Sequence, residues 1–390
     1  MTKSADVIII GGGIAGAGAA YEVAEFASVV LLEREYQCGY HSTGRSAASF
    51  TENYGNSAIR RLAIASRRFL ENPPGEISER PLLSTRGMIT IARADQLQSL
   101  EEQLREARAF VPSIERMSVS AAIERVPILR PDYLAGAFIE PHSMELDVSG
   151  LHQGFLRAAR RRGATIVVDS GVERIERRGD RWRIAARGGC FEAVSLVNAA
   201  GAWADEIASL AGAMPLGLVA KRRTAFNVPP PSGIDVRGWP MVNDAGDEFY
   251  FKPDAGQLFV SPADATPSAP TDAQPEDIDV ATGVERLERA TILNVTRVSR
   301  AWAGLRTFAA DGSPVVGFDG EVPGFVWLAG QGGYGIKTAP ALSRICAALL
   351  RGAALPEDLL RAGITAADLS PGRLKLMHGV DSTPLAHTGG

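Results

Sequence analysis

A short apolar run near the start of the chain predicts a buried strand. Residues 7–10 are Val-Ile-Ile-Ile, an uninterrupted β-branched stretch that is typical of a parallel strand covered on both faces. A glycine-rich turn at 11–16 follows, and small residues up to Phe26 indicate a helix. A second apolar run at 28–32 predicts a second strand, which Glu33 closes. The start of the chain therefore predicts a strand, a tight turn, a helix and a strand that ends in an acid.

Helical and strand-like patterns alternate along the rest of the chain. Helices are expected at 56–70, 94–109, 149–162, 203–211, 274–290 and 337–351. Strands are expected at 88–92, 135–139, 165–168, 181–185, 194–197, 248–252, 258–260 and 325–328. Proline-rich pieces at 228–232 and 266–275 are typical of surface loops. This mixture predicts an α/β fold with additional antiparallel strands.

Length and composition narrow the class of protein. A chain of 390 residues is too long for one simple core and predicts two domains. With 45% hydrophobic and 22% charged residues it is an ordinary globular chain, which excludes disordered and fibrous classes. The net charge of −4 excludes a broad nucleic-acid-binding surface.

Cysteine, histidine and hydropathy patterns exclude further classes. The three cysteines are widely separated and lack C-x-x-C spacing, and the five histidines lack metal-ligand spacing. We therefore expect a reducing compartment, no disulfide framework and no metal. No uncharged stretch reaches the ~18–20 residues of a membrane span. A cytoplasmic protein without a transmembrane segment is expected, with a frayed tail at 376–390.

Three glycines in the first turn carry a dinucleotide-binding pattern. Gly11 permits the tight turn, Gly13 lets a pyrophosphate approach the backbone, and Gly16 lets the helix pack closely on the strand. The helix N-terminus adds amide N–H groups for the phosphates. Glu33 lies 22 residues after Gly11, close to the ~20 expected for an acid that binds an unphosphorylated ribose. The pattern predicts a dinucleotide site, without separating FAD from NAD.

Two further segments favour FAD. Small and hydroxyl residues at 39–48 are expected to open a helix with a second anion-binding N-terminus, where an NAD domain would continue to a third strand. The glycine-rich segment 330–338 is expected to let a flat ring lie against backbone at the start of another helix. Residues 196–203 add a strand that enters a small-residue turn. The alternative for segment 330–338 is a strand-to-helix turn without a ligand.

These segments, in order, resemble the glycine and D-amino-acid oxidase superfamily of FAD-dependent amine oxidoreductases, and within it the bacterial D-arginine dehydrogenases. The matching pieces are 11–16, 32–35, 39–48, 72–74, 151–154, 197–203, 215–218, 221–223, 252–256, 302–306 and 331–336. The resemblance implies a discontinuous Rossmann-like FAD-binding domain and a second α+β substrate-binding domain built on a mixed sheet. The FAD-binding domain is expected from 1–80, 145–215 and 300–375, and the substrate-binding domain from 81–144 and 216–299.

The resemblance also implies a cofactor site. The expected FAD-binding residues are Gly11, Gly13, Ile14, Ala15, Gly16, Glu33, Arg34, Ser42, Thr43, Gly44, Ser46, Ala47, Val172, Ala200, Gly201, Trp203, Gly332, Gly333, Tyr334, Gly335, Ile336 and Lys337. Some members of the superfamily attach flavin through histidine, for which His41 is the candidate here. No cysteine lies in 302–314 for a thioether link, and noncovalent FAD is expected.

A D-amino acid is the substrate that the resemblance implies, oxidised by hydride transfer from Cα to flavin N5. The imino acid is then hydrolysed to a keto acid and ammonia. Arginine suits the carboxylate because its planar fork binds two oxygens. The matching positions are Arg306 and Arg223 for the carboxylate, Tyr54 and Tyr250 beside the substrate, and the carbonyl of Gly304 for the amine. The alternatives are solvated arginines and ordinary aromatic packing.

Two positions depart from the D-arginine dehydrogenases. Lys337 stands where they have a neutral glutamine, and we expect its cation at the N1–C2=O edge of the flavin, against an exposed lysine as the alternative. Gly87 replaces a glutamate that pairs with a guanidinium substrate, and Arg86 adds a cation beside it. Neutral or apolar D-amino acids are therefore expected to outperform D-arginine, unless Glu52 or Glu248 supplies the missing charge.

Two other functions remain open from the sequence. An oxidase of the same fold would use O₂ on D-amino or N-methyl amino acids, in the manner of sarcosine oxidases. An NAD-binding sensor without chemistry belongs to a different class. The electron acceptor, whether a quinone, a dye or O₂, and the oligomeric state stay open.

Overall fold

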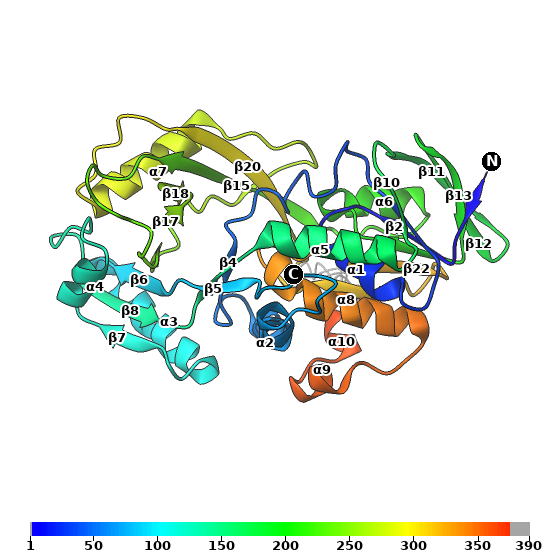
Figure 1. Ribbon diagram of the computed structural model, residues 1–390, viewed down its shortest axis with the longest axis horizontal. Helices are drawn as coiled ribbons and strands as arrows, with labels where there is room; N and C mark the ends of the chain where they lie inside the picture. Colours follow the sequence, from blue (N-terminus) through cyan, green and yellow to red (C-terminus); the bar gives the residue numbers. More distant parts are fainter. Residues whose placement is uncertain (1, 375–390) are drawn as a thin grey trace, which may run out of the picture.

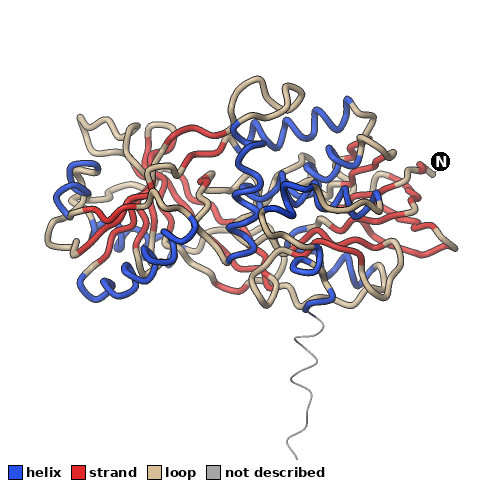
Figure 2. Tube along the Cα trace, turned by 90° about the horizontal axis from the view of Figure 1, so that it is seen from below, coloured by secondary structure: helices blue, strands red, loops and turns tan. Residues whose placement is uncertain are grey.

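The structure, a computed structural model, describes residues 2–374. The tail predicted at 376–390 lies outside the described residues. Figure 1 shows two lobes, one built on a six-stranded sheet and the other on a nine-stranded sheet. Figure 2 shows the helices that cover the strands of each lobe. Within the described range, two smaller sheets of four and three strands complete the β structure.

The six-stranded sheet forms the centre of the first lobe, on the right in Figure 1. Its order is β10-β3-β2-β14-β22-β21, and neighbouring strands are parallel except for β21 and β22. The strands are β2 (Val7–Ile10), β3 (Val29–Leu32), β10 (Thr165–Val167), β14 (Ser195–Asn198), β21 (Val315–Phe318) and β22 (Phe325–Ala329). Every residue of β2 and β22 is buried, as parallel strands covered on both faces require.

Both faces of this sheet are covered, which makes three layers. One face packs into a core with α1 (Ile14–Val23), α2 (Ser57–Glu71), α5 (Val148–Arg161) and α8 (Gly335–Arg351). The other packs against α6 (Ala204–Leu210) and the sheet of β1 (Lys3–Ser4), β11 (Val172–Arg178), β12 (Arg181–Ala186) and β13 (Gly189–Ala193). Three short helices complete the lobe: η2 (Gly201–Trp203), α9 (Glu357–Arg361) and α10 (Ala366–Leu369). This is the Rossmann-like architecture, and the predicted fold class is confirmed.

The nine-stranded sheet forms the second lobe. Its order is β19-β15-β18-β17-β16-β6-β8-β7, with β20 on the other edge of β15. The strands are β6 (Met88–Ala92), β7 (Glu115–Met117), β8 (Gly136–Glu140), β15 (Val219–Val228), β16 (Met241–Asp244), β17 (Tyr250–Asp254), β18 (Gln257–Ser261), β19 (Thr266–Pro267) and β20 (Arg300–Phe308). The sheet is mixed, as predicted, because β6 and β16 are parallel and the other pairs antiparallel.

Helices and a small sheet complete this side of the molecule. The helices of the second lobe are η1 (Ala94–Gln96), α3 (Leu97–Phe110), α4 (Val119–Arg125) and α7 (Asp277–Ala290), and they pack on the nine-stranded sheet. Between the lobes in Figure 1 lies a three-stranded sheet of β4 (Ser49–Phe50), β5 (Leu83–Thr85) and β9 (Met144–Leu146). In this sheet β4, which follows segment 39–48, pairs with β9, which directly precedes α5.

With one exception, each predicted helix and strand is present, with ends within three residues of the expectation. The helix expected to open at 39–48 is wrong. Residues 38–45 form turns instead, and β4 begins at Ser49 after three residues without regular structure. The side chains of Ser42 and Thr43 bond to the backbone of Leu305 and Ile14, which stabilises the turn conformation in competition with a helix.

Two long strands, β15 and β20, were not predicted. Their pairing is antiparallel over the whole length of β20, from Val219–Phe308 to Asn227–Arg300. Residue 300 was expected to begin the third FAD-binding segment, whereas β20 belongs to the nine-stranded sheet. The division into two domains otherwise stays a prediction. Charged residues at 221–223 interrupt the apolar alternation that would have marked β15.

Candidate active site

A cavity of about 860 Å³ extends between the two sheets. Its lining begins at the carboxyl ends of parallel strands, where ligands bind in open α/β sheets. Ile10 is the last residue of β2, and Glu33 directly follows β3. It continues to the inner face of the nine-stranded sheet, with Arg223 on β15 and Tyr250 on β17. One cavity therefore brings the predicted cofactor and substrate residues together.

The predicted cofactor residues line this cavity with three exceptions, Gly16, Gly44 and Tyr334. Gly16 serves packing, because a Cβ there would lie 1.9 Å from the carbonyl oxygen of Gly11. Gly44 is equally confined, since its Cβ would lie 2.7 Å from the Gly39 carbonyl oxygen. Close contacts with backbone oxygens therefore explain both glycines without ligand contact.

The first turn offers an anion site of the expected form. The N–H of Ile14 donates to Thr43 Oγ1 at 3.0 Å, which ties the 39–48 segment to the start of α1. A Cβ on Gly13 would meet nothing closer than Thr43 Oγ1 at 3.4 Å, so this face of the turn is open. The first amides of a helix have no carbonyl partner within it and point outward. A pyrophosphate fits this arrangement.

The acid that is predicted to bind the ribose, Glu33, lies beside the turn. The Glu33 carboxylate accepts from the N–H of Gly12 at 2.7 Å and from that of Glu35 at 2.9 Å. Burial raises the pKa of Glu33, while these two amides lower it. Ser170, which is 1% exposed, lines the same part of the cavity and its Oγ has no partner in the described residues. A buried hydroxyl of this kind calls for a polar ligand, and the adenosine end of FAD supplies one.

The substrate half is built on β15 and β20. Arg223 pairs with Gly304 and Lys221 with Arg306 across the two strands, and alternation puts Arg223, Gly304 and Arg306 on one face. All three line the cavity. The glycine loop after β22 closes on this face, because a Cβ on Gly333 would lie 3.0 Å from Arg306 Nη1.

The two guanidinium groups form no ion pair with a carboxylate of residues 2–374. Arg306 Nη2 donates to the Tyr250 hydroxyl at 3.3 Å, and Arg223 Nε donates to the backbone carbonyl of Asp264 at 2.5 Å. Burial by itself raises the pKa of Tyr250, yet Arg306 and Arg223 lower it below its ordinary value. This wall of the cavity is therefore positive and lacks an anion.

Tyr54 and Lys337 lie together on another wall. The Tyr54 ring lies 5.1 Å from that of Tyr334 and is 42% exposed. Lys337 is only 4% exposed, and its ammonium donates to the carbonyls of Thr51 at 2.8 Å and Tyr54 at 2.6 Å. The alternative interpretation of Lys337 as an exposed lysine is therefore wrong. The expected role of Lys337 at the flavin edge stays a prediction, and the structure gives its ammonium two backbone partners.

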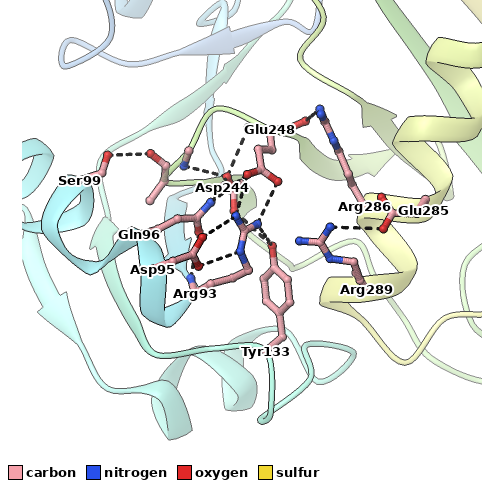
Figure 3. Close-up of polar contacts among 12 residues, drawn as sticks. Arg93, Asp95, Gln96, Ser99, Tyr133, Asp244, Glu248, Glu285, Arg286 and Arg289 are labelled. Carbon is pink, nitrogen blue, oxygen red and sulfur yellow. Dashed lines mark hydrogen bonds and ion pairs between the residues drawn. The ribbon is translucent and has the colours of Figure 1, made fainter.

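The acids considered as replacements at Gly87 are engaged elsewhere. Glu52 pairs with Arg67 at 3.2 Å, and Glu248 pairs with Arg93 at 2.7 Å in the polar network of Figure 3. Neither lines the cavity. The Arg86 guanidinium pairs with Glu145 and donates to the carbonyl of Trp239 at 3.1 Å, so it also lies outside the cavity.

Two buried acids that line the cavity, Glu140 and Asp244, were missed by the sequence analysis. Glu140 ends β8, lies opposite Met88 of β6 and is 4% exposed. Its carboxylate accepts from the Thr51 hydroxyl. The available signal was an acid that closes an apolar strand, the same signal that identified Glu33.

The described residues hold neither a metal-binding cluster nor a membrane-spanning helix. Among residues 2–374, no group of three or more His, Cys, Asp or Glu side chains could hold a metal ion. In the same part of the chain, no helix combines the length and the apolar character needed to cross a membrane.

Known proteins resemble this chain over most of its length. Glycine oxidase of Geobacillus kaustophilus is 26% identical over 392 residues, covering 95% of this chain and 97% of that protein. Its crystal structure superimposes with a TM-score of 0.83, at 23% identity over 95% of this chain and 98% of the other. Human mitochondrial sarcosine dehydrogenase is 24% identical over 348 residues, which are 83% of this chain and 37% of that enzyme.

The family described as FAD dependent oxidoreductase matches residues 6–349, which include both halves of the cavity. The open turn at Gly13, the acid at Glu33 and the glycine loop before α8 all lie within that match. With this extent of agreement, the chain belongs to the family of FAD dependent oxidoreductases, and FAD is its cofactor.

Proposed function

We propose that this enzyme is a D-amino-acid dehydrogenase, similar to the D-arginine dehydrogenases, that oxidises the Cα–N bond of its substrate. The observation that carries the proposal is the pair of cavity-facing guanidinium groups, Arg223 and Arg306, without a carboxylate partner among the described residues. A fork-shaped cation is the natural partner of an α-carboxylate. The glycine oxidase and sarcosine dehydrogenase names of two relatives support an amino-acid substrate.

The residues of the substrate half divide the work of binding. Arg306 and Arg223 hold the carboxylate, and the backbone carbonyl of Gly304 accepts from the amine. Tyr250, held by Arg306, closes the same wall. The substrate reacts as its free amine and loses two electrons and two protons to become an imino acid, which water converts to a keto acid and ammonia. Holding both ends of the substrate fixes the direction of its Cα–H bond.

FAD supplies the two-electron acceptor when it is bound. The turn at Gly13 and the α1 N-terminus hold its pyrophosphate, Glu33 its ribose, and the loop at 332–336 its ring. We propose that the attachment is noncovalent. Mild denaturation should then release all flavin into the supernatant, and yellow precipitated protein would contradict this.

Neutral or apolar side chains are the proposed specificity. No acid stands at Gly87, and Glu52 and Glu248 are paired with arginines.

Glu140 and Asp244 are buried acids that line the cavity beside the nine-stranded sheet. Glu140 is bonded to Thr51, and the positive charge of Lys337 lowers its pKa, which burial raises. Asp244 accepts from the Gln96 amide at 2.9 Å and from the N–H of Gly246 at 2.8 Å. A cationic side chain would therefore meet two guanidinium groups and buried acids that are already bonded. Asp247, which is exposed and also lines the cavity, is an acid left to offset this cost.

The test is a steady-state comparison of kcat/KM across D- and L-amino acids, with a dye acceptor and with O₂. D-methionine, D-leucine and D-phenylalanine should exceed D-arginine by at least about 30-fold, because an unpaired charge costs about 2–5 kcal/mol. A clear preference for D-arginine over all three would refute the specificity. Turnover of the L-forms alone would refute the stereochemistry.

A second candidate is an oxidase of glycine or N-methyl amino acids that uses O₂. The similarity to a glycine oxidase over 95% of the chain favours it. The same panel decides between the two, with glycine and sarcosine added. Faster turnover of these small substrates with O₂ than of any D-amino acid with dye would replace the first proposal.

A further inference from the structure

Two buried charged residues hold the same short segment, 51–54, from different lobes. Lys337 reaches it from α8 of the first lobe, and its ammonium donates to the carbonyls of Thr51 and Tyr54. Glu140 reaches it from β8 of the second lobe and accepts from the hydroxyl of Thr51. The Thr51 hydroxyl oxygen in turn accepts from the N–H of Asn53 at 3.0 Å. The segment is thus fixed at both its main chain and its side chains.

These hydrogen bonds hold the segment that carries Tyr54, whose side chain lines the cavity. The Lys337 ammonium lies 5.6 Å from the ring centroid of Tyr54 and 5.5 Å from that of Tyr334, so both rings pack around the same cation. Tyr54 is 42% exposed and lines the cavity. Without the lysine, the ring contact with Tyr334, the residue that precedes α8, remains, but the hydrogen bond from α8 to the Tyr54 carbonyl is lost.

We infer that Lys337 and Glu140 are positioning residues, which hold segment 51–54 so that Tyr54 forms a fixed wall of the substrate cavity. The inference rests on the proposed function, because Tyr54 is taken to face the substrate. It assigns to Lys337 an effect on substrate affinity, whereas a cation at the flavin edge would act on the redox chemistry. The two roles therefore differ in what they change.

The geometry explains how a buried lysine and a buried glutamate can hold this segment. A buried ammonium needs acceptors for its hydrogens, and two backbone carbonyls satisfy two of the three. A neutral amine keeps two N–H hydrogens, one for each of the two carbonyls. Both hydrogen bonds to segment 51–54 can therefore persist when Lys337 loses its proton. The facing charged groups are Glu140, Glu52 and Arg60, and the two acids offset the cost of burying the cation.

The test is hydrogen exchange of segment 51–54 in the FAD-loaded protein, together with amino-acid kinetics. Lys337→Met keeps the bulk and removes the donors, and Thr51→Val removes the hydroxyl at constant shape. Exchange of 51–54 should become at least about tenfold faster in both variants, since local opening loses its ties. KM should rise about tenfold with kcat within about threefold, because the variants lose substrate binding and keep the chemistry.

Conservative variants and a matched control complete the design. Lys337→Arg and Glu140→Gln keep a donor and an acceptor, and both should restore slow exchange to within about threefold of the parent. Lys252→Met removes another buried lysine, which pairs with Glu145 outside the cavity, and should leave the exchange of 51–54 unchanged.

Two results would overturn the inference. Unchanged exchange of 51–54 in Lys337→Met would show that the lysine does not hold the segment. A fall in kcat with an altered flavin spectrum and an unchanged KM would assign Lys337 to the flavin. Failure of every amino acid as a substrate would refute the proposed function instead, and the exchange comparison needs no turnover.

Discussion

Replacing Arg306 by methionine removes a guanidinium whose contacts among residues 2–374 include a tyrosine hydroxyl but no carboxylate. The fork is partly buried, bonds to Tyr250 at 3.3 Å and lies against the loop at Gly333. A bound substrate would bring the missing carboxylate and exclude water from the pair. Loss of one partner of such a desolvated pair costs about 3–5 kcal/mol. At 1.36 kcal/mol per factor of ten, kcat/KM should fall by about 150-fold to 5,000-fold.

Stability should move differently from activity. Methionine fills most of the space and leaves no acid of the described residues unpaired, so the free energy of unfolding should stay constant or rise. Arg222, one residue from Arg223, is the matched control because it pairs with Asp279 at 2.9 Å and does not line the cavity. Arg222→Met should lose stability and keep kcat/KM within about threefold.

The assay is steady-state kcat/KM with the best substrate of the amino-acid panel, alongside thermal unfolding of each loaded variant. Arg306→Lys keeps the charge and loses the fork, so it should fall between the parent and Arg306→Met. A loss below about tenfold in Arg306→Met would refute the carboxylate role, since it is less than a charge-assisted hydrogen bond contributes. An equal loss in Arg222→Met would point to the strand rather than the site.

Three further predictions concern the cofactor turn and the buried lysine. Gly13→Ala should fold with a parent-like Tm and lose at least about tenfold in FAD affinity by titration, because its Cβ meets only Thr43 Oγ1 and occupies the phosphate approach. Gly16→Ala should lower the Tm of the FAD-free protein, at a cost of about 1–3 kcal/mol, because its Cβ would lie 1.9 Å from the Gly11 oxygen. Burial lowers the pKa of Lys337 to about 7, so above that pH the unfolded chain binds more protons and stability rises with pH. Relative to Lys337→Met, the unfolding free energy measured by denaturant should rise by about 2 kcal/mol between pH 7 and 9, and a flat difference would contradict the shift.

The features that the sequence predicted well depend on neighbours in the chain. The strand at Val7–Ile10, the glycine turn and Glu33 lie within one short unit, and each has a distinct reason for its residue type. The loop at 330–338 precedes α8 as expected. In these places local propensity, spacing and tertiary packing agree, which is the condition under which patterns are informative.

The features that were missed depend on partners far apart in the chain. Segment 39–48 satisfies helix-start rules, yet Ser42 is held by Leu305, 263 residues away. The partner of the Glu140 carboxylate is the Thr51 hydroxyl, 89 residues earlier in the chain. Local rules hold no information about such partners, and the turn wins over the helix because its hydroxyls are satisfied there.

Two long strands that escaped prediction, β15 and β20, are also the ones that carry the proposed chemistry, and one cause explains both facts. A strand is recognised by apolar residues on the face that it buries. On β15 and β20 that face turns toward a polar cavity, so Arg223 and Arg306 occupy positions where a core strand would have Val or Ile. Such cations weaken the pattern and cost stability unless an anion is brought to them. Their presence on a wall of the cavity therefore favours binding over folding as the reason for them, which the paired Arg306 and Arg222 variants test directly.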